Sequence, residues 1–555
     1  MRQSVLHTDS LNSVPPCVVF EDEHLLVVNK PSGWNTHAPS PFAGEGIYDW
    51  LRHREPRWSS LAIIHRLDKE TSGLIVFGKT PLANRSLTEQ FAGRNIQKKY
   101  LLLTDRAPRQ KSFTAKSKIH RVGERYASGG HGDEAETIFS VAANVKRLKT
   151  KSPDPVESLP VGRYGIEAKP LTGRTHQIRV QAAENGCPIL GDKLYGGSPF
   201  HRVCLHAAEL SFKHPATGAE ASFRAPCDFE ADARLALRRA IIEPQRTDAF
   251  RLIHGSGDGR PGWYVEQLGD ALLSQGEAPL AETQRAELIS RATNPALRTY
   301  HKTLTRHIRG ASVQQASPQL VLGPPAPERF VIRENGVKFE LSFSEGYSVG
   351  LFLDQRDNRR RLLAGHIAAD FALCQSEIQN PKSEILNTFS YTCAFSVCAA
   401  LAGARVTSLD LSKKYLEWGR RNFVMNGLDP AAHDFIYGDT FDWLKRFAKK
   451  ARAFDSVLLD PPTFSQSKEH GVFRAEKDYG KLVSAALPVL KPGGVLFAST
   501  NAADLAPEKF LAMVESPIRS AGRKIVRQHY VPQPPDFPVS RDEPAYLKTV
   551  WLRVA

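Results

Sequence analysis

The stretch 384–412, EILNTFSYTCAFSVCAALAGARVTSLDLS, decides the fold class of the second half of this chain. Its apolar pattern predicts a strand over 385–389, a turn of small residues, and a helix that begins at about 396 and ends near Gly403. A second strand over 405–409 follows, with Asp410 at its end. Strands that alternate with helices form a parallel, doubly wound sheet, so this half is predicted to be α/β and Rossmann-like.

The same alternation continues toward the C-terminus. A helix over 412–426 stops at Asn426-Gly427, and further strands are expected at 435–437, 457–459 and 495–498. The N-terminal half has a different pattern of apolar residues. Its short β-rich runs predict an α+β domain with a mixed antiparallel sheet, and they lie at 17–20, 25–29, 61–64, 74–77 and 100–104.

These different secondary-structure patterns divide the chain into parts. A polar, Pro-containing stretch at 146–160 is predicted to be a surface loop. The run 330–343, FVIRENGVKFELSF, predicts a hairpin with Asn335-Gly336 at its tip. We expect four parts: a first domain over 15–226, a helical connector over 227–246, a small mixed α+β subdomain over 247–345, and the α/β domain over 346–555.

Composition narrows the class of protein. The chain has 555 residues with 74 Lys and Arg against 59 Asp and Glu, a net charge of +15 that favours a polyanion, most commonly nucleic acid, as partner. No apolar stretch reaches the ~18–20 residues of a membrane span, and Met1-Arg2-Gln3-Ser4 lacks the apolar core of a secretory signal, so a cytoplasmic location is expected. Seven cysteines without paired metal-type spacing predict reduced thiols and no metal site.

Two polar segments of the N-terminal half could form a site. Asp68 lies in HRLDKETSG, 65–73, between two strand-like runs, where a carboxylate could face a cleft or could cap a turn. The segment 172–180, TGRTHQIRV, is predicted to be a strand with Arg174 and His176 on one face and Arg179 on the other. Neither segment decides a function alone.

Together, these segments resemble the RluA-type RNA pseudouridine synthases through about residues 17–226. The resemblance lacks the RNA-binding S4 module that many members carry, so the chain is similar to the shorter members. The motifs that carry it are Asn29-Lys30-Pro31-Ser32-Gly33, His65-Arg66-Leu67-Asp68, Lys98-Lys99-Tyr100, the segment 172–180, and Ile189-Leu190-Gly191-Asp192 with Tyr195-Gly196.

The resemblance implies an isomerase that detaches uracil from its ribose, rotates it and rejoins it through carbon without a cofactor. Asp68 matches the family's catalytic aspartate, which attacks covalently or stabilises the detached sugar. Arg179 matches the arginine that pairs with it. Tyr100 matches the aromatic residue that stacks on the base, and Arg66 matches the residue that fills the gap left by a flipped nucleotide.

A second candidate site lies at the strand ends of the α/β half. The small-residue turn 390–395 would let a ligand approach a helix N-terminus, and Asp410 could accept hydrogen bonds from a ribose diol. A nicotinamide cofactor would need the same features, but the G-x-G-x-x-G fingerprint is absent. Asp460-Pro461-Pro462-Thr463-Phe464, at the end of a strand, would form a rigid loop at the edge where substrates bind and argues against the nicotinamide cofactor, with a structural turn as the alternative.

This half, over about residues 247–555, resembles the RlmI/RlmK-type class I methyltransferases, without the PUA-like module of the RlmI branch. The resemblance implies S-adenosylmethionine (SAM) as cofactor and ribosomal RNA as substrate. It places Asp439 near the adenine and Asp410 near the ribose, and Asp354, Gln355 and Arg356 along the methionine side or the RNA groove. The other implied SAM-site residues are Phe389, Tyr391, Thr392, Leu411 and Asp460, and Pro461, Pro462 and Phe464 are implied to position the base.

One position departs from the family pattern. Cys393-Ala394 stands where the family usually has Gly-Gly or Gly-Ser, so a Cβ occupies a place where glycine allows close approach. A second position bears on which RNA atom receives the methyl group. C5 methylation of cytosine needs a cysteine thiolate, but Ser499-Thr500-Asn501 contains no cysteine where the cytosine-specific relatives have one. Guanine N7 is already nucleophilic and needs only alignment, so it is favoured.

The prediction is therefore a bifunctional RNA-modification enzyme acting on RNA, with 23S ribosomal RNA favoured and no membrane. The oligomeric state stays open. The alternatives are a SAM-inactive, RNA-binding C-terminal domain, a transfer RNA substrate, and cytosine C5 methylation through Cys374, Cys393 or Cys398. The cluster Arg359-Arg360-Arg361 is expected to be a solvated face and not an RNA contact.

Overall fold

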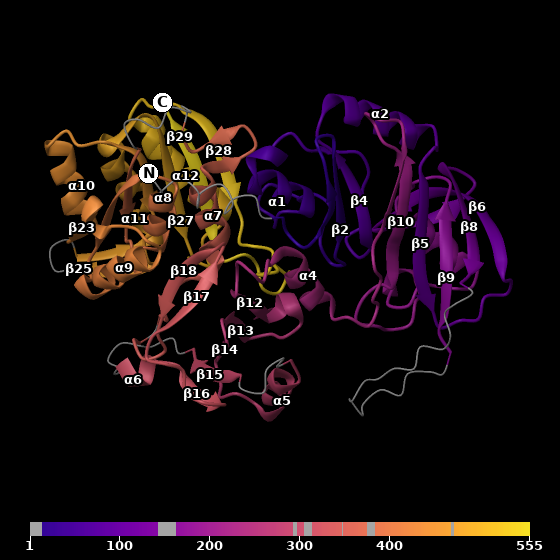
Figure 1. The fold of residues 1–555 in the computed structure, drawn as a ribbon, viewed down its shortest axis with the longest axis horizontal. Coiled ribbons are helices and arrows are strands. Elements are labelled where there is room, and N and C mark those ends of the chain that lie inside the picture. The colour runs from indigo at the N-terminus through magenta and orange to yellow at the C-terminus, as the bar shows by residue number, and fades with distance from the viewer. Residues whose placement is uncertain are drawn as a thin grey trace.

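A computed structural model describes residues 14–142, 162–291, 297–304, 313–346, 348–374, 383–467 and 471–555. The predicted loop at 146–160 lies outside the described residues. Figure 1 shows two large lobes side by side, the N-terminal lobe in indigo and magenta and the C-terminal lobe in orange and yellow, with a smaller sheet below the C-terminal lobe. No helix in the described part of the chain is long and apolar enough to cross a bilayer.

The N-terminal lobe is built on one 11-stranded sheet in the order β1-β2-β4-β10-β5-β9-β8-β6-β7, with β3 paired to β4 and β11 to β10. All its pairs are antiparallel except β4 with β10. Every residue of the central strand β4, SGLIVFG, is buried, as expected of a continuous apolar run between two neighbouring strands. The strands are β1 (Val18–Glu21), β2 (Leu25–Lys30), β3 (Ala62–Ile63), β4 (Ser72–Gly78), β5 (Gln97–Thr104), β6 (Ser112–Val122), β7 (Arg125–Gly129), β8 (Asp133–Val141), β9 (Tyr164–Pro170), β10 (Leu205–Lys213) and β11 (Glu220–Arg224). The helices are α1 (Ile47–Arg54), α2 (Pro81–Ala92) and α3 (Gln177–Glu184).

The predicted strand over 172–180 is wrong, because this segment is a turn followed by helix α3. Gln177 closes the turn: its side-chain oxygen accepts hydrogen bonds from Thr172 Oγ1 at 2.8 Å and from the backbone N–H of Arg174 at 3.0 Å. His176 caps the helix with a left-handed backbone, φ 56°. The consecutive residues from 177 to 182 are all buried, which a two-faced strand does not allow.

A connector helix and a small sheet follow. Helix α4 (Ala233–Ile241) confirms the helical reading of the connector segment. The small sheet has the order β12-β13-β14-β15-β16, in which β14 and β15 are parallel. Its elements are β12 (Ala249–His254), β13 (Trp263–Leu268), β14 (Ala271–Gly276), α5 (Glu282–Arg291), β15 (Arg298–Thr303), α6 (Val313–Ala316) and β16 (Gln319–Leu322).

The predicted hairpin is confirmed as β17 (Phe330–Glu334) and β18 (Val337–Leu341). Asn335 and Gly336 form its tip with φ of 53° and 83°, the left-handed pair that a tight hairpin turn needs. The buried face of the hairpin, with Ile332 and Phe339, packs in the same apolar cluster as Phe423 of the C-terminal lobe. The hairpin thus ties the small sheet to the larger one.

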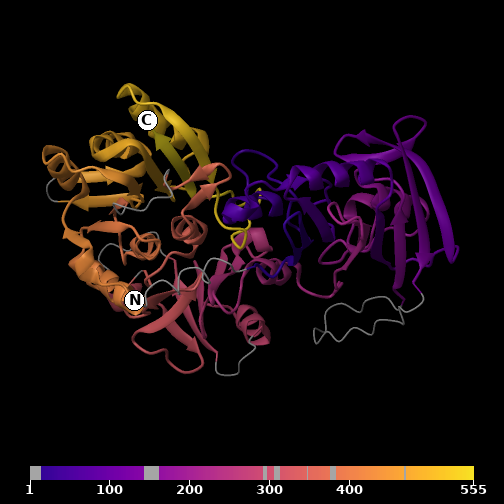
Figure 2. The ribbon, with the colours of Figure 1, turned by 45° about the horizontal axis from the view of Figure 1, so that its top comes forward.

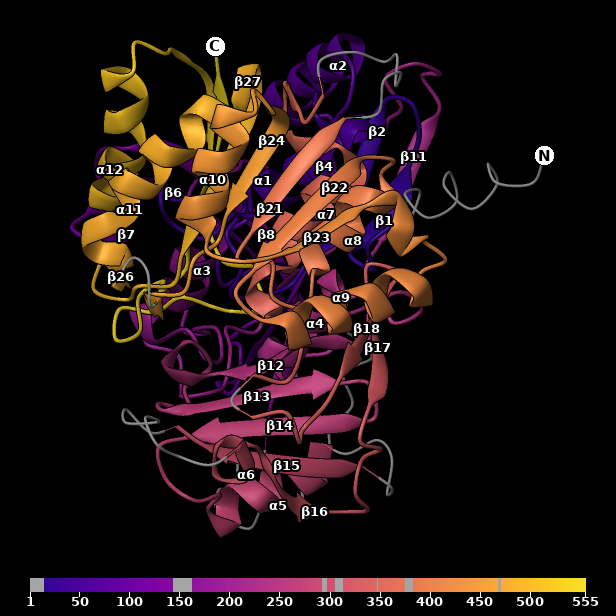
Figure 3. The same ribbon diagram turned by 90° about the vertical axis from the view of Figure 1, so that its left-hand side faces the viewer.

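The C-terminal lobe is a seven-stranded sheet in the order β23-β22-β21-β24-β27-β29-β28. Its first five strands are parallel and β29 is antiparallel, so the predicted doubly wound sheet is confirmed. Figure 3 shows the sheet with its helices, above the small sheet. Helices α7, α8 and α9 bury one apolar cluster against it, and α10, α11 and α12 bury a second.

The strands of this lobe are β19 (His366–Ala368), β20 (Phe371–Ala372), β21 (Glu384–Thr388), β22 (Arg405–Asp410), β23 (Asp434–Tyr437), β24 (Phe454–Leu459), β25 (Phe464–Ser467), β26 (Gly471–Arg474), β27 (Leu490–Thr500), β28 (Ile525–Val531) and β29 (Lys548–Val554). Its helices are α7 (Arg356–Ala364), α8 (Ala394–Leu401), α9 (Lys413–Met425), α10 (Thr440–Lys449), α11 (Ala475–Ala486) and α12 (Pro507–Ser520).

The expectation that Arg359-Arg360-Arg361 is a solvated face is wrong. The three residues are 2%, 3% and 5% exposed, because α7 lies between its own sheet and helix α1 of the N-terminal lobe. Each guanidinium meets a carboxylate there: Arg359 pairs with Glu334, Arg360 with Glu55, and Arg361 with Glu45. Figure 2 shows the segment of α1 at the junction of the lobes. Two of these three pairs therefore join the halves of the chain.

Candidate active sites

Asp68 lies on the loop between β3 and β4, and its side chain is 24% exposed. Hydrogen bonds from neighbouring side chains to its backbone carbonyl groups fix the loop. Lys30 Nζ donates to the carbonyl of Lys69 at 3.1 Å, and Thr36 Oγ1 donates to that of Leu67 at 2.8 Å. The Asp68 carboxylate thus stands at the surface on a rigid backbone.

Lys30 is a residue whose role the sequence did not reveal. It is fully buried, and its ammonium group also donates to the carbonyls of Pro31 and Trp34 at 3.0 and 2.7 Å. Burial lowers the pKa of Lys30 to about 7, although the charges of Asp68 and Glu70 oppose the shift. Its only sequence signal was its place in the motif that follows the second strand.

Arg179 approaches Asp68 but is held by Asp192. Its Nη1 lies 3.6 Å from Asp68 Oδ2 and 3.6 Å from Glu70 Oε2. Its Nε and Nη2 donate to the two Asp192 oxygens at 2.6 and 2.9 Å, a buried bidentate pair. Burial opposes the charged form, but the Asp192 carboxylate outweighs it and raises the pKa of Arg179 above its ordinary value. Arg179 is therefore a permanent cation aimed beside Asp68.

Two aromatic residues and one imidazole complete this site. Tyr100, on β5, is near Asp68, and burial followed by that charge raises the pKa of its hydroxyl. His176 Nε2 lies 3.8 Å from Asp68 Oδ2, and its Nδ1 shares a hydrogen bond of 2.7 Å with the Tyr195 hydroxyl. Burial lowers the pKa of His176, and the ring of Tyr195 lies 5.1 Å from the Arg179 guanidinium. Sequence reasoning gave His176 and Tyr195 no role, because a strand would have directed His176 away from Arg179.

Arg66 lies two residues before Asp68 and is exposed. It therefore projects from the same loop as the carboxylate. The structure brings Asp68, Arg179 and Tyr100 together, with Arg66 at the rim. The arrangement offers a carboxylate beside a fixed cation and a partly buried aromatic ring.

In the C-terminal lobe, the loop between β21 and α8 has an unusual backbone. Phe389, Tyr391 and Cys393 have φ of 53°, 48° and 63°, in the left-handed region that non-glycine residues rarely adopt. The Asp410 carboxylate accepts the backbone N–H groups of Tyr391 and Ser412, each at 2.8 Å. Thr392 Oγ1 donates to the Gly350 carbonyl at 2.6 Å. These bonds hold the loop in its strained shape over the strand ends.

Asp410 keeps acceptor capacity for a ligand, since a carboxylate has about four lone-pair sites and two backbone N–H groups use only part of it. Burial raises its pKa, against the effect of these hydrogen bonds. Leu411 beside it is exposed. Asp439 caps α10 by accepting the N–H groups of Phe441 at 2.8 Å and Asp442 at 3.3 Å. These residues form the edge of the sheet from β22 to β23.

The side chain of Cys393 packs against helix α9. It is fully buried, and a Cβ added to Gly419 would lie 2.3 Å from Cys393 Sγ. The glycine at position 419 therefore leaves room for the thiol of Cys393, which stands where the family usually has glycine. Burial raises the pKa of Cys393 to about 12, so the thiol stays protonated.

Asp460, at the end of β24, lies next to Gln355 and Ser499. Gln355 Nε2 donates to Ser499 Oγ at 2.7 Å and lies 3.3 Å from Asp460 Oδ1. Burial raises the pKa of Asp460 to about 6, opposed by the Ser499 hydroxyl and reinforced by the charge of Asp354. Pro461 is buried, whereas Pro462 and Phe464 are exposed beyond it. A carboxylate with a raised pKa at this edge is typical of a functional site.

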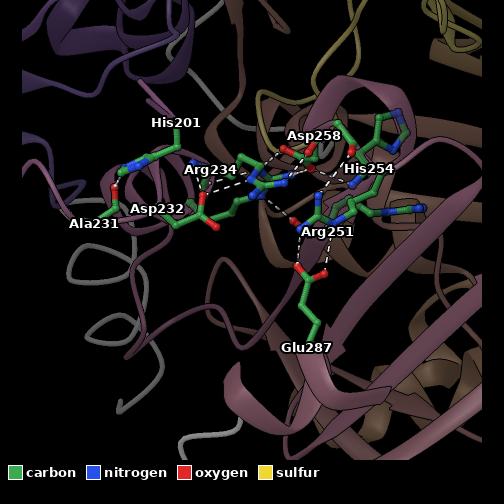
Figure 4. Close-up of polar contacts among 11 residues, drawn as sticks. His201, Ala231, Asp232, Arg234, Arg251, His254, Asp258 and Glu287 are labelled. Carbon is green, nitrogen blue, oxygen red and sulfur yellow. Dashed lines mark hydrogen bonds and ion pairs between the residues drawn. The ribbon is translucent and has the colours of Figure 1, made fainter. Parts of the chain in front are cut away.

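The residues just before and at the start of α7 have different surroundings: Gln355 contacts Asp460, whereas Arg356 belongs to a buried ion-pair network. Asp354 accepts a hydrogen bond from the Tyr546 hydroxyl at 2.9 Å. Arg356 is buried in a bidentate pair with Asp536, at 2.8 and 2.6 Å. Asp536 also accepts the backbone N–H of Arg251, beside Asp258. Figure 4 shows the polar contacts beside the connector helix, where Arg234 donates to the backbone carbonyl of Asp258 and Arg251 lies close by. Asp536 therefore links Arg356 to β12 of the small sheet, and its backbone carbonyl accepts a hydrogen bond of 2.7 Å from Arg238 of the connector helix.

Known proteins match both halves. Residues 24–184 match the RNA pseudouridylate synthase family, and residues 282–553 match the S-adenosylmethionine-dependent methyltransferase family. A ribosomal RNA large subunit methyltransferase of Deinococcus radiodurans is 33% identical over 334 residues, which are 58% of this chain and 78% of that protein. Ribosomal RNA large subunit methyltransferase I of Klebsiella pneumoniae is 32% identical over 57% of this chain and 76% of its own length. A crystal structure of a methyltransferase complexed with SAH is 31% identical, covers 55% of this chain and 75% of that chain, and has a TM-score of 0.47.

Proposed function

Because this chain belongs to the S-adenosylmethionine-dependent methyltransferase family and carries an RluA-type RNA pseudouridine synthase in its N-terminal half, we propose that it makes two modifications on one ribosomal RNA. The proposed substrate is the large-subunit RNA, 23S in bacteria. The relatives that match 57–58% of the chain support this choice, since they are named for that RNA. The net charge of +15 suits a polyanionic substrate. Transfer RNA is the main alternative.

The proposed division of labour follows the sheets. The synthase would comprise residues 15–226, the connector 227–246, the small subdomain 247–345 and the methyltransferase 346–555. In the synthase, Asp68 would attack the ribose or stabilise it while the C–N bond to uracil breaks. Arg179, 3.6 Å away, would orient that carboxylate, Tyr100 would stack on the rotating base, and Arg66 would occupy the gap in the RNA.

The edge of the C-terminal sheet fits SAM. Asp410 retains acceptor capacity for a ribose diol, and the exposed Leu411 offers an apolar contact next to it. The strained loop with Phe389, Tyr391 and Thr392 would face the cofactor, and Asp439 would lie by the adenine. Bound SAM supplies an activated methyl group. Asp354 and Gln355 would line the methionine side, with Pro461, Pro462 and Phe464 positioning the RNA base.

We favour guanine N7 as the acceptor. Gln355 and Ser499 meet beside Asp460, so a hydroxyl stands where C5 methylation would need a thiolate. Burial raises the pKa values of Cys393 and Cys398 to about 12, which keeps these thiols protonated. N7 attacks the methyl carbon with its own lone pair, and no ring proton has to leave. Asp460 and Gln355 would then orient the base.

The alternative of a SAM-inactive C-terminal domain rested on Cys393. The packing of its thiol against Gly419 of α9 argues for a working cofactor loop, because the extra atoms fill a place prepared for them. The single observation that best supports methyl transfer is the polar group at the carboxyl edge of the sheet, where Gln355 Nε2 donates to Ser499 Oγ at 2.7 Å and lies 3.3 Å from Asp460 Oδ1.

Nucleoside mass spectrometry of ribosomal RNA, from cells with and without the gene, tests the proposal. We expect loss of both a pseudouridine and a 7-methylguanosine. Complementation should separate the activities: Asp68→Asn should restore only the methyl group, and Asp460→Asn only pseudouridine. Loss of 5-methylcytidine would contradict the choice of N7. An unchanged methylation profile, together with no SAM binding by the purified chain, would support the inactive domain.

A further inference from the structure

A cluster of metal-ligating side chains lies where the two lobes meet, apart from both candidate active sites. Glu45 and His53 belong to the N-terminal lobe, just before and within α1, and His529 belongs to β28 of the C-terminal lobe. One potential ligand atom from each residue lies within 4.8 Å of the other two. None of the three residues has a role in either modification reaction.

The geometry is close to that of a zinc site. Glu45 Oε1 lies 2.7 Å from His53 Nδ1 and 3.9 Å from His529 Nε2. The two imidazole rings are 4.4 Å apart and inclined by 69°. A tetrahedral ion with bonds of about 2.0–2.1 Å needs ligand atoms about 3.3 Å apart, so Glu45 Oε1 and His53 Nδ1, now at hydrogen-bond distance, would have to separate, and the His529 nitrogen, within 4.8 Å of both, would have to approach. Two imidazoles and a carboxylate are a donor set that zinc and its neighbours accept.

A second observation points to a missing partner. His529 Nε2 is buried and has no hydrogen-bond partner among the described residues. An orphaned polar atom of this kind destabilises a fold by about 1–3 kcal/mol. In the neutral ring this atom can carry a lone pair, and the nearby Glu45 carboxylate, 3.9 Å away, has no proton to give it. A metal ion would satisfy both groups.

Arg361 is the competing cation. Its Nη2 lies 3.3 Å from Glu45 Oε1, but the same guanidinium also donates to the carbonyls of Ile367 and Asp357 at 2.9 and 3.1 Å. The carboxylate has a second oxygen, so it can accept from Arg361 and bind an ion together. A cavity of about 10 Å³, lined by Glu45, His53 and Arg361 among others, adjoins the cluster. This is the space of roughly one water molecule, a suitable fourth ligand.

We propose that Glu45, His53 and His529 bind a divalent transition-metal ion of the zinc class, and that this ion joins the synthase half to the methyltransferase half. The site is structural, because it lies at the contact of α1 with the C-terminal lobe and has no link to either candidate active site. Its occupation stabilises the docking of the lobes by an amount that grows with the logarithm of the metal concentration above the dissociation constant.

The test uses the full, tag-free chain after treatment with a chelator. Titration with Zn²⁺ against a colorimetric chelator should show one tight site per chain, and Co²⁺ should give the visible absorption of a four-coordinate ion. Zn²⁺ should also raise the thermal unfolding temperature. His529→Ala and His53→Ala should each weaken binding at least 10–100-fold.

Matched variants separate this site from adventitious binding. His366→Ala removes a neighbouring imidazole of the same interface, and Cys374→Ser removes an exposed thiol; both should bind Zn²⁺ as the wild type does. Glu45→Gln keeps the shape of the side chain and removes its charge. Weaker Zn²⁺ binding by this variant would show that the effect of the alanine variants is not caused by misfolding. The proposal is overturned if the wild type binds no Zn²⁺ below millimolar concentration, or if loss of His53 and His529 leaves the tight site intact.

Discussion

Arg360 on helix α7 and Glu55 at the end of helix α1 form an ion pair whose side chains are only 3% and 4% exposed. The pair joins the methyltransferase lobe to the synthase lobe. Nearby, Arg54 pairs with Glu243 at 2.6 Å, so further buried charge ties the first lobe to the connector. A junction of matched buried charges fixes the orientation of two lobes, because any displacement leaves a charge without its partner.

Removal of Glu55 should loosen this junction. In Glu55→Ala the Arg360 guanidinium stays buried without its carboxylate, and breaking a buried pair in this way costs about 3–5 kcal/mol. We expect a lower unfolding temperature and faster limited proteolysis at the connector. Lys481→Ala, which removes an exposed pair with Asp478, is the control and should change stability by less than about 1 kcal/mol. An equal effect of both substitutions would contradict the role of the junction.

Asp192 should act as a positioning residue for Arg179. Asp192→Asn keeps the shape of the side chain but weakens the bidentate pair at 2.6 and 2.9 Å. The loss of charge-assisted hydrogen bonds, about 1.5–3 kcal/mol, predicts a roughly 10–150-fold slower single-turnover rate of pseudouridine formation with unchanged RNA affinity. Tritium release from 5-tritiated uridine in RNA measures the rate. Glu70→Gln, which alters the more exposed partner 3.6 Å from Arg179, should have a smaller effect, and the reverse order would refute the assignment.

Asp460 should make the protein less stable as pH rises. Its folded-state pKa of about 6 lies above the ordinary 3.8, so the folded state holds its proton more tightly than the unfolded state does. The resulting stability is fully present below about pH 4 and is lost as pH rises through 6, a difference of about 2–3 kcal/mol. Asp460→Asn should therefore unfold at a higher temperature than wild type at pH 8 and at a similar one at pH 4, while it loses methyl transfer. Equal unfolding temperatures at pH 8 would show that burial of this carboxyl carries no cost.

Gly419 and Cys393 should be energetically coupled. A Cβ at Gly419 would lie 2.3 Å from Cys393 Sγ, so Gly419→Ala should destabilise the lobe by about 1–3 kcal/mol and weaken SAM binding. Cys393→Gly removes the obstructing atoms and should restore most of the loss in the double variant. Calorimetric titration with SAM and thermal unfolding measure the two effects. The control is Ala399→Gly, which perturbs the neighbouring helix α8 without touching this contact. Gly427→Ala would not serve, because the φ of 72° at Gly427 would itself strain an alanine. Strict additivity of the two substitutions would contradict the coupling.

Much of the fold was predictable because it follows local rules. The alternating strands and helices after residue 384 fixed the parallel sheet, and Asn335-Gly336 fixed a hairpin turn that only left-handed residues can make. The segment 172–180 was predicted wrongly, since its alternating pattern fits a strand but Gln177 closes a turn with Thr172 and Arg174. That interaction depends on three side chains meeting in space, which period alone does not reveal.

The sequence by itself determined the two families and the motif residues, from Asp68 and Tyr100 to Asp410 and Asp460, because motifs record the chemistry that a site needs. The tertiary structure alone decided how these residues are supported. It gave Arg179 the Asp192 carboxylate, and it buried Arg360 and Arg361 against Glu55 and Glu45. A run of three arginines carries no sign of burial in its own sequence. Whether it faces water or a carboxylate depends on partners about 300 residues away, which only the folded chain brings into contact.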